Sequence, residues 1–425
     1  MITREIFNQL IGIKENYEMP EKLLGILLED QKREKLFCSL LEYEQDFSKD
    51  WFTDIFQDEH GDRDALKQDF TPDCLCELMN QISGAADSCA DICAGTGGLT
   101  IKKWSANPNG CFYCEEISSR TIPMLLMNLS IRNMQGVIVH GNSLTGEIET
   151  VYQLDKGEKF SEISYTLPVA SSRIFPTVIM NPPYSLKWND VGKYQEDLRF
   201  KDYGIPPKKA ADYAFLLHGL AKLDQGGELF AILPHGVLFR GNSEGKIREN
   251  LIRANLIDAV IGLPDKLFAH TSIPVCIMVL KKNRAEKDIL FIDASKNFEK
   301  GAKQNVMKPE HIGRIASVYR DRRQEEKFSS RIDFQTLEDN QFNLNIPRYV
   351  DTFEREPVPD LCEVLSEIEK TDMEIKETEG QIFQMMNSMY GTNPKAEQEL
   401  KDAMEIFERD IIEKYGKQFI GKCLA

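Results

Sequence analysis

The chain has 425 residues, of which 42% are hydrophobic and 28% are charged, a composition typical of a soluble globular protein with more than one domain. No apolar run is long enough to span a bilayer and the first residues lack the pattern of a signal peptide, so we expect a cytoplasmic protein without a membrane segment. The net charge of −16 argues against a broad nucleic-acid-binding surface, so any DNA contact must use local positive charge or a partner.

The 10 cysteines are scattered along the chain, which in a reducing compartment predicts buried free thiols. Cys111 and Cys114 form a C-x-x-C pair, but no second pair or histidine cluster completes a zinc site. Both lie in an expected strand, where this spacing points them to opposite faces of the sheet. We therefore expect no metal site.

Residues 1–66 predict a helical N-terminal region, because apolar residues recur there at helical spacing. A small helical cap on the main domain is the simplest interpretation. Thr71 and Pro72 then form a typical helix start, followed by an expected helix from Cys74 to Ile82. The N-terminus of that helix could meet an anionic group.

A glycine-rich turn follows, within the segment 89–100, which has the pattern of a strand, a turn and a helix start. Gly95, Gly97 and Gly98 allow the backbone to approach a ligand closely. The turn lacks the last glycine of the dinucleotide fingerprint and the Gly-Lys-Ser/Thr of a P-loop. Alone, it is a weak indication of a cofactor site.

Polar side chains end the next two expected strands. Strand 111–114 ends at Glu115 and Glu116, and an acidic residue in this position commonly binds ribose hydroxyls. Strand 137–140 is followed by Asn142 and Ser143, and an Asn side chain can donate and accept as an adenine edge requires. Ligand-type residues at successive strand ends are difficult to explain as core packing, so we expect a binding site there.

The fourth strand of this series, Thr177–Met180, runs into the loop Asn181–Tyr184. Pro182 and Pro183 have no N–H to give to a ladder, so the strand must stop before them. In an open α/β sheet, ligands bind at the carboxyl ends of strands. The loop could present an amide, a backbone carbonyl and an aromatic face to a planar base bearing an amino group. An ordinary surface turn is the alternative interpretation.

Strands and helices continue to alternate after the loop, which predicts a doubly wound α/β fold with a mostly parallel sheet. We expect a helix from Ala214 to Leu223 that is closed at Gly226-Gly227, strands at 229–233 and 259–264, a helix at 247–255 and a final strand at 275–280. The expected domains are a helical N-terminal region (1–66), a catalytic domain (67–290), a connector (291–354) and a helical tail (355–425).

Basic residues are frequent between the loop and the helix that follows it. They are interleaved with acidic residues, so the stretch is either a solvated loop or a phosphate-contacting loop beside the active site. The basic residues are Lys187, Lys193, Arg199, Lys201, Lys208 and Lys209.

Four further motifs carry a resemblance to a known family: AFLLHG (214–219), LPHGVLF (233–239), TSIP (271–274) and FNLNIPRYVD (342–351). The glycine turn precedes the Asn-Pro-Pro-Tyr loop in the chain. This order and the four motifs together resemble the modification subunit of type I restriction-modification systems. Those subunits are S-adenosylmethionine-dependent methyltransferases. The resemblance covers roughly Asp69 to Glu354. It implies methylation of the exocyclic amino group of adenine in double-stranded DNA, with the base flipped out of the duplex.

The resemblance also implies the cofactor contacts. The glycine turn and Asp91 lie beside the methionine part, an acidic residue holds the ribose, and Asn142 reads the adenine. Glu116 fits the family pattern of an acidic residue followed by Ile better than Glu115. The family usually has Asp where this chain has Asn142, which keeps the acceptor oxygen. The cofactor-binding residues implied are Thr71, Pro72, Asp91, Ala94, Gly95, Thr96, Gly97, Gly98, Glu116, Asn142, Ser143 and Asn181.

The catalytic residues implied are Asn181, Pro182, Pro183, Tyr184 and Phe268. Asn181 and the Pro182 carbonyl accept the hydrogens of the target amine, and Tyr184 stacks on one face of the base. Family members often have Phe where this chain has Tyr184. Phe268 is expected either to cover the other face of the base or to be an ordinary core aromatic.

The sequence of the tail predicts a helix with an apolar seam, since Leu361, Ile368, Ile375 and Ile382 recur at heptad spacing. A break follows at 391–394. A second amphipathic helix follows the break. The two helices form either an intramolecular hairpin or a surface for a partner. The resemblance favours docking to a specificity subunit, and it allows for a restriction subunit in the same complex.

Three other functions share part of this pattern. A protein glutamine methyltransferase uses a similar loop but is much shorter and leaves the tail unexplained. A DNA-binding assembly subunit that has lost activity is compatible with Asn142, although the intact Asn181 loop argues against it. A dinucleotide oxidoreductase is opposed by the incomplete glycine fingerprint.

Overall fold

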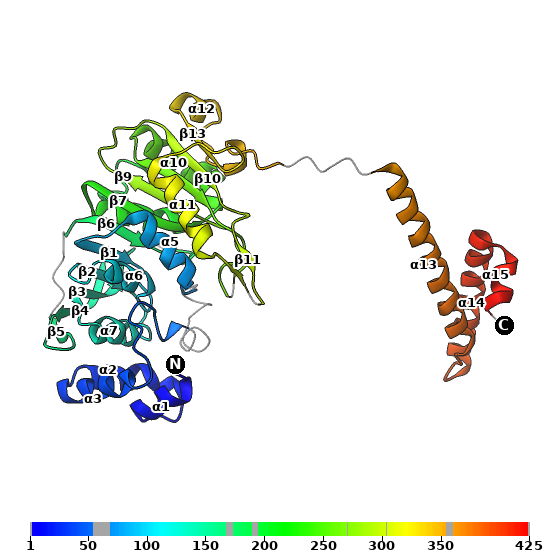
Figure 1. Cartoon of the computed structure of the whole chain (residues 1–425), viewed down its shortest axis with the longest axis horizontal. Helices are drawn as coiled ribbons and strands as arrows, with labels where there is room; N and C mark the ends of the chain where they lie inside the picture. The colour runs from blue at the N-terminus through cyan, green and yellow to red at the C-terminus, as the bar shows by residue number, and fades with distance from the viewer. Residues whose placement is uncertain are drawn as a thin grey trace. The chain divides into compact units, whose positions relative to one another are not determined.

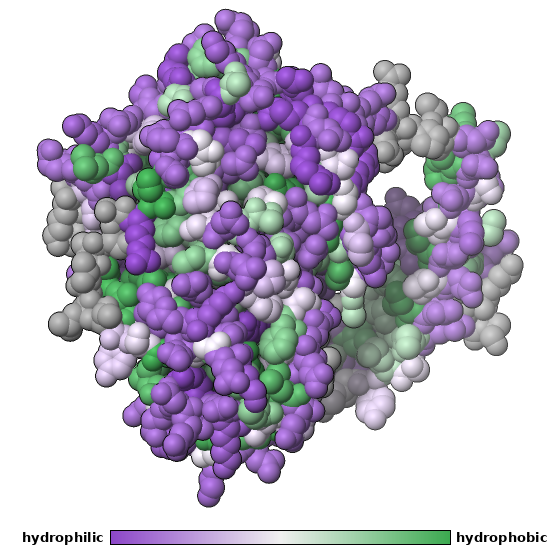
Figure 2. Space-filling model, turned by 60° about the vertical axis from the view of Figure 1, so that its left-hand side comes forward, coloured by the Kyte–Doolittle hydropathy of each residue, from purple (hydrophilic) through white to green (hydrophobic). Residues whose placement is uncertain are grey.

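The computed structural model describes residues 2–53, 69–166, 173–188, 194–269, 271–302, 304–353 and 360–423. They form two compact units, Met1–Phe353 and Glu354–Ala425, which are described separately. Within the described ranges, no helix combines the length and the apolar character needed to cross a bilayer. Hydrophilic side chains dominate the face shown in Figure 2, with hydrophobic ones in scattered patches between them.

An 11-stranded sheet runs through the described part of the first unit, in the order β13-β10-β8-β9-β7-β6-β1-β2-β3-β4-β5 (Figure 1). Strands β3, β2, β1, β6 and β7 are parallel, whereas β9 lies antiparallel between β7 and β8. The strands are β1 (Ser88–Ile92), β2 (Cys111–Glu116), β3 (Gln135–Asn142), β4 (Glu147–Asp155), β5 (Glu162–Thr166), β6 (Phe175–Met180), β7 (Leu223–Pro234), β8 (Ile257–Gly262), β9 (Val275–Lys281), β10 (Ile289–Asp293) and β13 (Ser329–Ile332). A separate ribbon pairs β11 (Glu299–Lys300) with β12 (Asn305–Val306).

Helices cover both faces of the sheet. One buried cluster joins the sheet to the N-terminal helices and to α5, α6, α7 and α11, and a second joins it to α8, α9, α10 and α12. Figure 1 shows α5 and α11 side by side on the first face. These helices are α1 (Arg4–Ile11), α2 (Met19–Leu27), α3 (Asp30–Leu41), α5 (Asp73–Ser83), α6 (Gly98–Ala106), α7 (Ile122–Ile131), α8 (Asp212–Ala221), α9 (Gly236–Phe239), α10 (Asn242–Arg253), α11 (Pro309–Asp321) and α12 (Phe334–Asp339), with short 3₁₀ turns at Asn16–Glu18 and Ile346–Arg348.

The register of β1 and β6 brings the two most informative loops together. Ile92 pairs with Met180 and with Glu115, so β1, β6 and β2 end at the same edge of the sheet. The glycine turn follows β1 and the Asn181 loop follows β6 directly. The doubly wound fold with a helical cap is thereby confirmed, and it places a candidate site at the carboxyl edge of the parallel strands.

Three details of the expected strand pattern were wrong. The sheet does not end at Val275–Leu280, because β10 pairs with β8 and β13 pairs with β10. Gly226 and Gly227 do not close a helix, since they lie within β7. Strands β4 and β5 were not predicted; β4 is only partly buried, so it lacks a continuous apolar run. The expected connector (291–354) therefore contains β13 and part of β10, both of which belong to the main sheet.

The second unit consists of α13 (Leu361–Asn387), α14 (Pro394–Tyr415) and α15 (Lys417–Cys423). Asn393 caps α14 by accepting from the N–H groups of Lys395 and Ala396. Phe383 and Ile411 form the buried contact between the helices. The heptad residues of α13 take little part in this contact, since their exposed fractions range from 42% at Ile382 to 72% at Leu361. The tail is a helical hairpin that leaves its apolar seam open.

Candidate functional site

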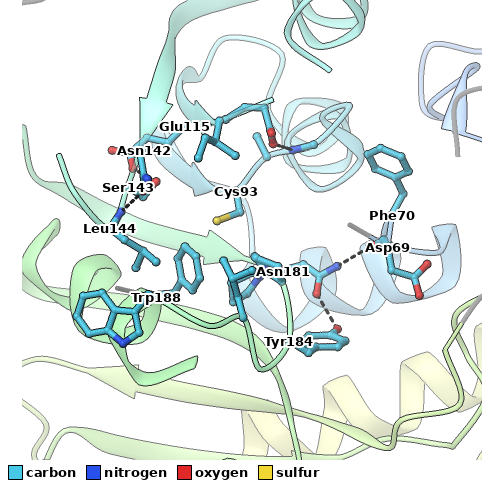
Figure 3. A pocket seen from close by; sticks show the side chains of 18 of the residues that line it. Asp69, Phe70, Cys93, Glu115, Asn142, Ser143, Leu144, Asn181, Tyr184 and Trp188 are labelled. Carbon is cyan, nitrogen blue, oxygen red and sulfur yellow. Dashed lines mark hydrogen bonds between the residues drawn. The ribbon is translucent and has the colours of Figure 1, made fainter. Parts of the chain in front are cut away.

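A pocket of about 740 Å³ lies at the carboxyl edge of β1, β2, β3 and β6. Its volume is in the range of small-molecule sites. Figure 3 shows Asn181 and Tyr184 on one side and Asn142, Ser143 and Leu144 on the other, with Cys93 between them. The residues of the predicted site that line the pocket are Thr71, Ala94, Gly95, Thr96, Gly98, Glu116, Asn142, Ser143, Asn181, Pro182, Pro183 and Tyr184.

The glycine turn forms the floor of this pocket. Gly95 has a φ of 58°, in the left-handed region that favours glycine. A Cβ at this position would also lie 3.1 Å from the ring of Phe70. The Gly95 N–H donates to the Glu116 carboxylate at 2.9 Å, which fixes the turn against β2. The backbone is thus held close to the pocket, and a larger residue would be strained and would require the Phe70 ring to shift.

Glu115 and Glu116 have different surroundings, although both line the pocket. Glu115 accepts from Ser143 Oγ at 2.6 Å and from His218 at 2.8 Å, and it forms an ion pair with Lys222. Burial would raise the pKa of Glu115, but interactions with His218 and Lys222 outweigh it and hold that pKa well below its usual range.

Glu116, by contrast, faces the glycine turn. One carboxylate oxygen accepts from the Gly95 N–H and the other from the Ser118 N–H at 2.8 Å. Burial raises the pKa of Glu116, and these backbone donors oppose the rise. The two acids therefore have separate tasks: Glu115 belongs to a buried ionic network, and Glu116 lies at the turn with Ile117 beside it in the pocket.

Asp91 lies beneath the glycine turn and is buried. Thr100, from the first turn of α6, donates to one carboxylate oxygen at 2.6 Å. The other oxygen has no hydrogen-bond partner among the residues described. Burial raises the pKa of Asp91 to about 7, and the nearby Glu116 adds to the rise. A cationic ligand group near this carboxylate would lower the energetic cost of its charge.

Asn142 shapes the loop after β3. Its Oδ1 accepts the Leu144 N–H at 2.9 Å, so the acceptor expected to face an adenine already caps the loop. Arg199 fastens the same loop from outside by donating to the carbonyls of Ser143 and Leu144 at 2.7 and 2.8 Å. Arg199 also pairs with Asp197. The Arg199 guanidinium is therefore engaged within the protein, where it holds the loop after β3.

The Asn181 side chain is held at both ends. Its Nδ2 donates to Thr71 Oγ1 at 2.8 Å, and its Oδ1 accepts from the Tyr184 hydroxyl at 2.7 Å (Figure 3 draws the latter bond). Burial raises the pKa of Tyr184 well above its usual value, which keeps this hydroxyl protonated as a donor. The amide is thus fixed in one orientation at the mouth of the pocket.

The ion pair of Arg240 with the buried Asp212 anchors the residue that follows Tyr184. Ser185 has a φ of 51°, and its N–H donates to Asp212 Oδ1 at 2.8 Å. Arg240 pairs with the other oxygen of Asp212 at 2.9 Å and donates to Ser185 Oγ at 3.2 Å. Arg240 directly follows the LPHGVLF motif, and Asp212 begins α8, the helix that carries the AFLLHG motif, so the elements with these two motifs position the Asn181 loop.

Four residues of the predicted site do not line this pocket. Pro72 is the N-cap of α5, and Gly97 is the N-cap of α6 with a φ of 95°. Asp91 lies beneath the turn, as described above. Phe268 is buried, and its ring meets the ring of Tyr184 edge-on with centroids 5.9 Å apart. Lys193 of the basic stretch lies outside the described residues.

Sequence reasoning missed several pocket residues. Phe70 and Asp69 precede the recognisable motifs, and Trp188 and Tyr194 follow them with their rings stacked 5.0 Å apart. Cys93 could have been found from its position between the expected strand and the glycine turn, and in the structure it has a φ of 64°, which is uncommon outside glycine. Burial raises the pKa of its thiol well above the usual value, so it is uncharged.

Comparison with known proteins gives a consistent family. The profile of the N-6 DNA Methylase family matches residues 50–357. The crystal structure of a type I restriction-modification system methyltransferase subunit from Streptococcus thermophilus is 32% identical, with a TM-score of 0.64, and the match covers 82% of this chain and 76% of that one. A modification subunit of a putative type I restriction enzyme from Vibrio vulnificus shares the fold at 16% identity, with a TM-score of 0.53 and coverage of 82% and 69%.

Curated relatives carry similar names. The type I restriction enzyme MpnII methylase subunit of Mycoplasma pneumoniae is 29% identical over 352 residues, which are 80% of this chain and 60% of that protein. The MjaVII methylase subunit of Methanocaldococcus jannaschii is 37% identical over 215 residues, which are 46% of this chain and 37% of that protein. The chain thus spans less than two thirds of the length of these relatives.

Proposed function

The chain belongs to the N-6 DNA methylase family, and from that membership we propose that it methylates the exocyclic amino group of adenine in double-stranded DNA. We further propose that S-adenosylmethionine is the methyl donor and that the chain works as the modification subunit of a type I restriction-modification complex. The observation that carries the proposal is the position of Asn181, whose amide stands at the rim of the same pocket as the glycine turn.

The residues around the pocket fit the methyl donor. Its methionine part suits the glycine turn, where Asp91 Oδ1 has no partner among the described residues. Glu116 suits the ribose hydroxyls, and Ile117 and Leu144 offer apolar walls for a purine. Asn142 Oδ1 is used by the Leu144 N–H, so the Nδ2 of Asn142 is the group that we assign to the adenine edge.

Bound S-adenosylmethionine supplies an electrophilic methyl group on a positively charged sulfur. The amino group of adenine is a poor nucleophile, because its lone pair is delocalised into the ring. Asn181 Oδ1 and the Pro182 carbonyl accept hydrogen bonds from the two N–H groups of this amine, which increases the electron density on its nitrogen. The fixed Asn181 amide adds proximity and orientation. The methylated nitrogen then loses a proton to solvent.

The target adenine must leave the duplex to reach this loop, at a cost of a few kcal/mol of stacking and pairing. The Tyr184 ring offers one stacking face at the rim of the pocket. Phe268 lies behind that ring in a T-shaped contact, so we assign it the support of Tyr184 rather than direct contact with the base.

We propose that the second unit binds a specificity subunit and that a restriction subunit can join the same complex. The open heptad seam of α13 supports this proposal, because an exposed apolar stripe on a helix suits a partner helix. The charge of −16 gives the chain little attraction to DNA outside local patches, which makes a DNA-reading partner necessary.

The proposal is tested by supplying radiolabelled S-adenosylmethionine to the complex that co-purifies with the chain, with genomic DNA from a strain lacking the gene and with total protein as acceptors. Label in DNA, recovered as N6-methyladenine, is the expected result. Label in protein, or none in DNA with the complete complex, would overturn it. Binding of S-adenosylmethionine without any transfer would instead favour an assembly subunit.

A further inference from the structure

We infer that Asp50, in the N-terminal region, is a positioning residue that holds the glycine turn in its cofactor-binding shape. This inference rests on the proposed function. The sequence of residues 1–66 predicted only a helical cap on the main domain. In the structure, the segment 46–53 lies against α7 and the glycine turn, and Thr53 lines the pocket. The cofactor pocket is therefore formed in part by the N-terminal region.

The Asp50 carboxylate accepts four hydrogen bonds. Two come from its own segment, from Phe52 N at 2.9 Å and Thr53 Oγ1 at 2.6 Å. The other two come from across the contact, from Thr96 Oγ1 at 2.6 Å and Asn128 Nδ2 at 3.0 Å. The Asp50 carboxylate thus connects Thr96 of the glycine turn, Asn128 of α7 and Thr53, which also lines the pocket.

Thr96 is held from two directions by this arrangement. Its hydroxyl donates to Asp50, and its carbonyl accepts from Asn128 Nδ2 at 2.8 Å. Both Thr96 and Asn128 are buried, so water cannot replace a lost partner at low cost. An amide at position 50 offers one acceptor oxygen in place of two, and its NH₂ group would face donors. Asp50→Asn is thus a small change in shape and a large change in bonding.

A second anchor keeps the segment in place without Asp50. Arg132 of α7 donates to the carbonyls of Phe47, at 2.8 Å, and of Lys49, and its guanidinium lies 5.0 Å from the ring centre of Trp51. Loss of the Asp50 bonds should therefore loosen Thr96 more than it releases the segment. We expect the effect on cofactor affinity, because the Asp50 carboxylate bonds to Thr96 of the glycine turn, whereas the Asn181 amide is held by Thr71 and Tyr184.

Calorimetric titration of the full chain with S-adenosylhomocysteine tests this inference. We expect Asp50→Asn to raise Kd about tenfold or more, since it disrupts buried hydrogen bonds. Methyl transfer by the co-purified complex should stay within about threefold of wild type at saturating S-adenosylmethionine. The reason is that Asp50 bonds to Thr96 of the cofactor-binding turn and, within the described residues, not to the Asn181 loop. The matched control is Asp46→Asn, since the side-chain bonds of Asp46 among the described residues go to Ser48 and Lys49 of its own segment and none to the glycine turn.

Hydrogen exchange of peptides covering residues 44–53 gives a readout that does not depend on activity. In the wild-type chain, S-adenosylhomocysteine should slow this exchange, because ligand on the turn stabilises the Thr96–Asp50 bond. In the Asp50→Asn variant, S-adenosylhomocysteine should not slow the exchange of these peptides. Should Asp50→Asn fail to fold, Asn128→Ala removes the second donor to the carboxylate and takes its place in both measurements.

An affinity of Asp50→Asn, or of its substitute, within about twofold of wild type would overturn the inference while leaving the proposed function intact. Equal slowing of exchange in variant and wild type would do the same. Failure of the wild-type chain to bind S-adenosylhomocysteine at all would instead contradict the proposed function, so the two failures are distinguishable.

Discussion

The Tyr184 hydroxyl donates a 2.7 Å hydrogen bond to Asn181 Oδ1, the same oxygen that we assign to the target amine. An amide oxygen has two lone pairs, so the incoming amine can share it or displace the hydroxyl. Thr71 holds the Nδ2 end of the amide in either case. The catalytic amide is thus preorganised by residues on both sides of it, before any base arrives.

Asn181→Ala should abolish methyl transfer while cofactor affinity stays within a few-fold of wild type. The amide belongs to the target side, and its described links to the opposite wall of the pocket are the bonds from Nδ2 to Thr71 Oγ1 and to the Asp69 carbonyl. Calorimetry with S-adenosylmethionine and a methyl-transfer assay measure the two effects. Undiminished turnover in this variant would falsify the proposed mechanism.

Tyr184→Ala should be much more damaging than Tyr184→Phe. Base–aromatic stacking contributes about 1–3 kcal/mol, which corresponds to roughly 5- to 150-fold in transfer rate, and Ala loses all of it. Phe keeps the ring and loses only the bond to Asn181, whose other end Thr71 still holds. Single-turnover rates decide the matter; equal losses for Phe and Ala would assign the main role to the hydroxyl.

Asp91→Asn should change how stability depends on pH in the cofactor-free chain. Burial raises the pKa of Asp91 from 3.8 to about 7, so its protonated form favours folding. The contribution of Asp91 to the free energy of unfolding is complete below pH 3.8. It falls as the pH rises toward 7, by at most about 1.4 kcal/mol per pH unit. The neutral amide has no such loss.

The Tm of Asp91→Asn minus that of wild type should therefore be more positive at pH 8 than at pH 5. Thermal unfolding at both pH values measures this difference, and Asp87→Asn, an acid just before β1 with no role in the pocket, serves as the control. A difference in Tm that does not change with pH would show that Asp91 is charged throughout this range.

Arg240→Gln should slow methyl transfer about tenfold without changing cofactor affinity, because Arg240 and Asp212 hold Ser185 directly after the catalytic loop. The unpaired Asp212 should also lower Tm. Arg253→Gln is the matched control, since its ion pairs with Glu249 and Glu338 are on the surface. A fall in cofactor affinity equal to the fall in rate would show that Arg240 supports the whole pocket instead.

Removal of everything after Pro357 should leave cofactor binding intact and eliminate both co-purification with a specificity subunit and site-specific methylation. The cut falls after the first compact unit, which ends at Phe353, so the pocket keeps all its described lining residues. Calorimetry, pull-down and methylation mapping measure the three effects. A truncated protein that still methylates one defined sequence would place recognition within the first unit.

The sequence predicted those parts of the site that lie on continuous motifs. β1, β2, β3 and β6 are short apolar runs, and their parallel order follows from the alternation with helices, so their ends could be placed together. The residue pattern alone did not distinguish the roles of Glu115 and Glu116, because each role depends on the face of β2 from which the side chain projects. Side-chain alternation in a strand decides that, once the neighbouring elements are known.

The sequence could not show contacts between distant segments. Asp50 meets Thr96, and Arg199 meets the loop after β3, through side chains that carry no local pattern of their own. The ring of Tyr184 was expected to stack on the base, but no role was predicted for its hydroxyl, whose bond to Asn181 depends on the turn of the loop. Propensity and periodicity describe backbone elements, so such tertiary bonds remained outside their reach.

The position of β9 has a consequence for synthesis on the ribosome. This strand leaves the ribosome after β7 and β8, yet it lies between them and pairs with both. Until Lys281 has emerged, β7 lacks its partner on one edge, and β8 lacks both of its partners, since β10 also follows in the chain. Unpaired edges of this kind recruit other chains. Nascent chains that stall or terminate before Val275 should therefore aggregate, whereas those that pass Lys281 can join β8 to β7 through β9.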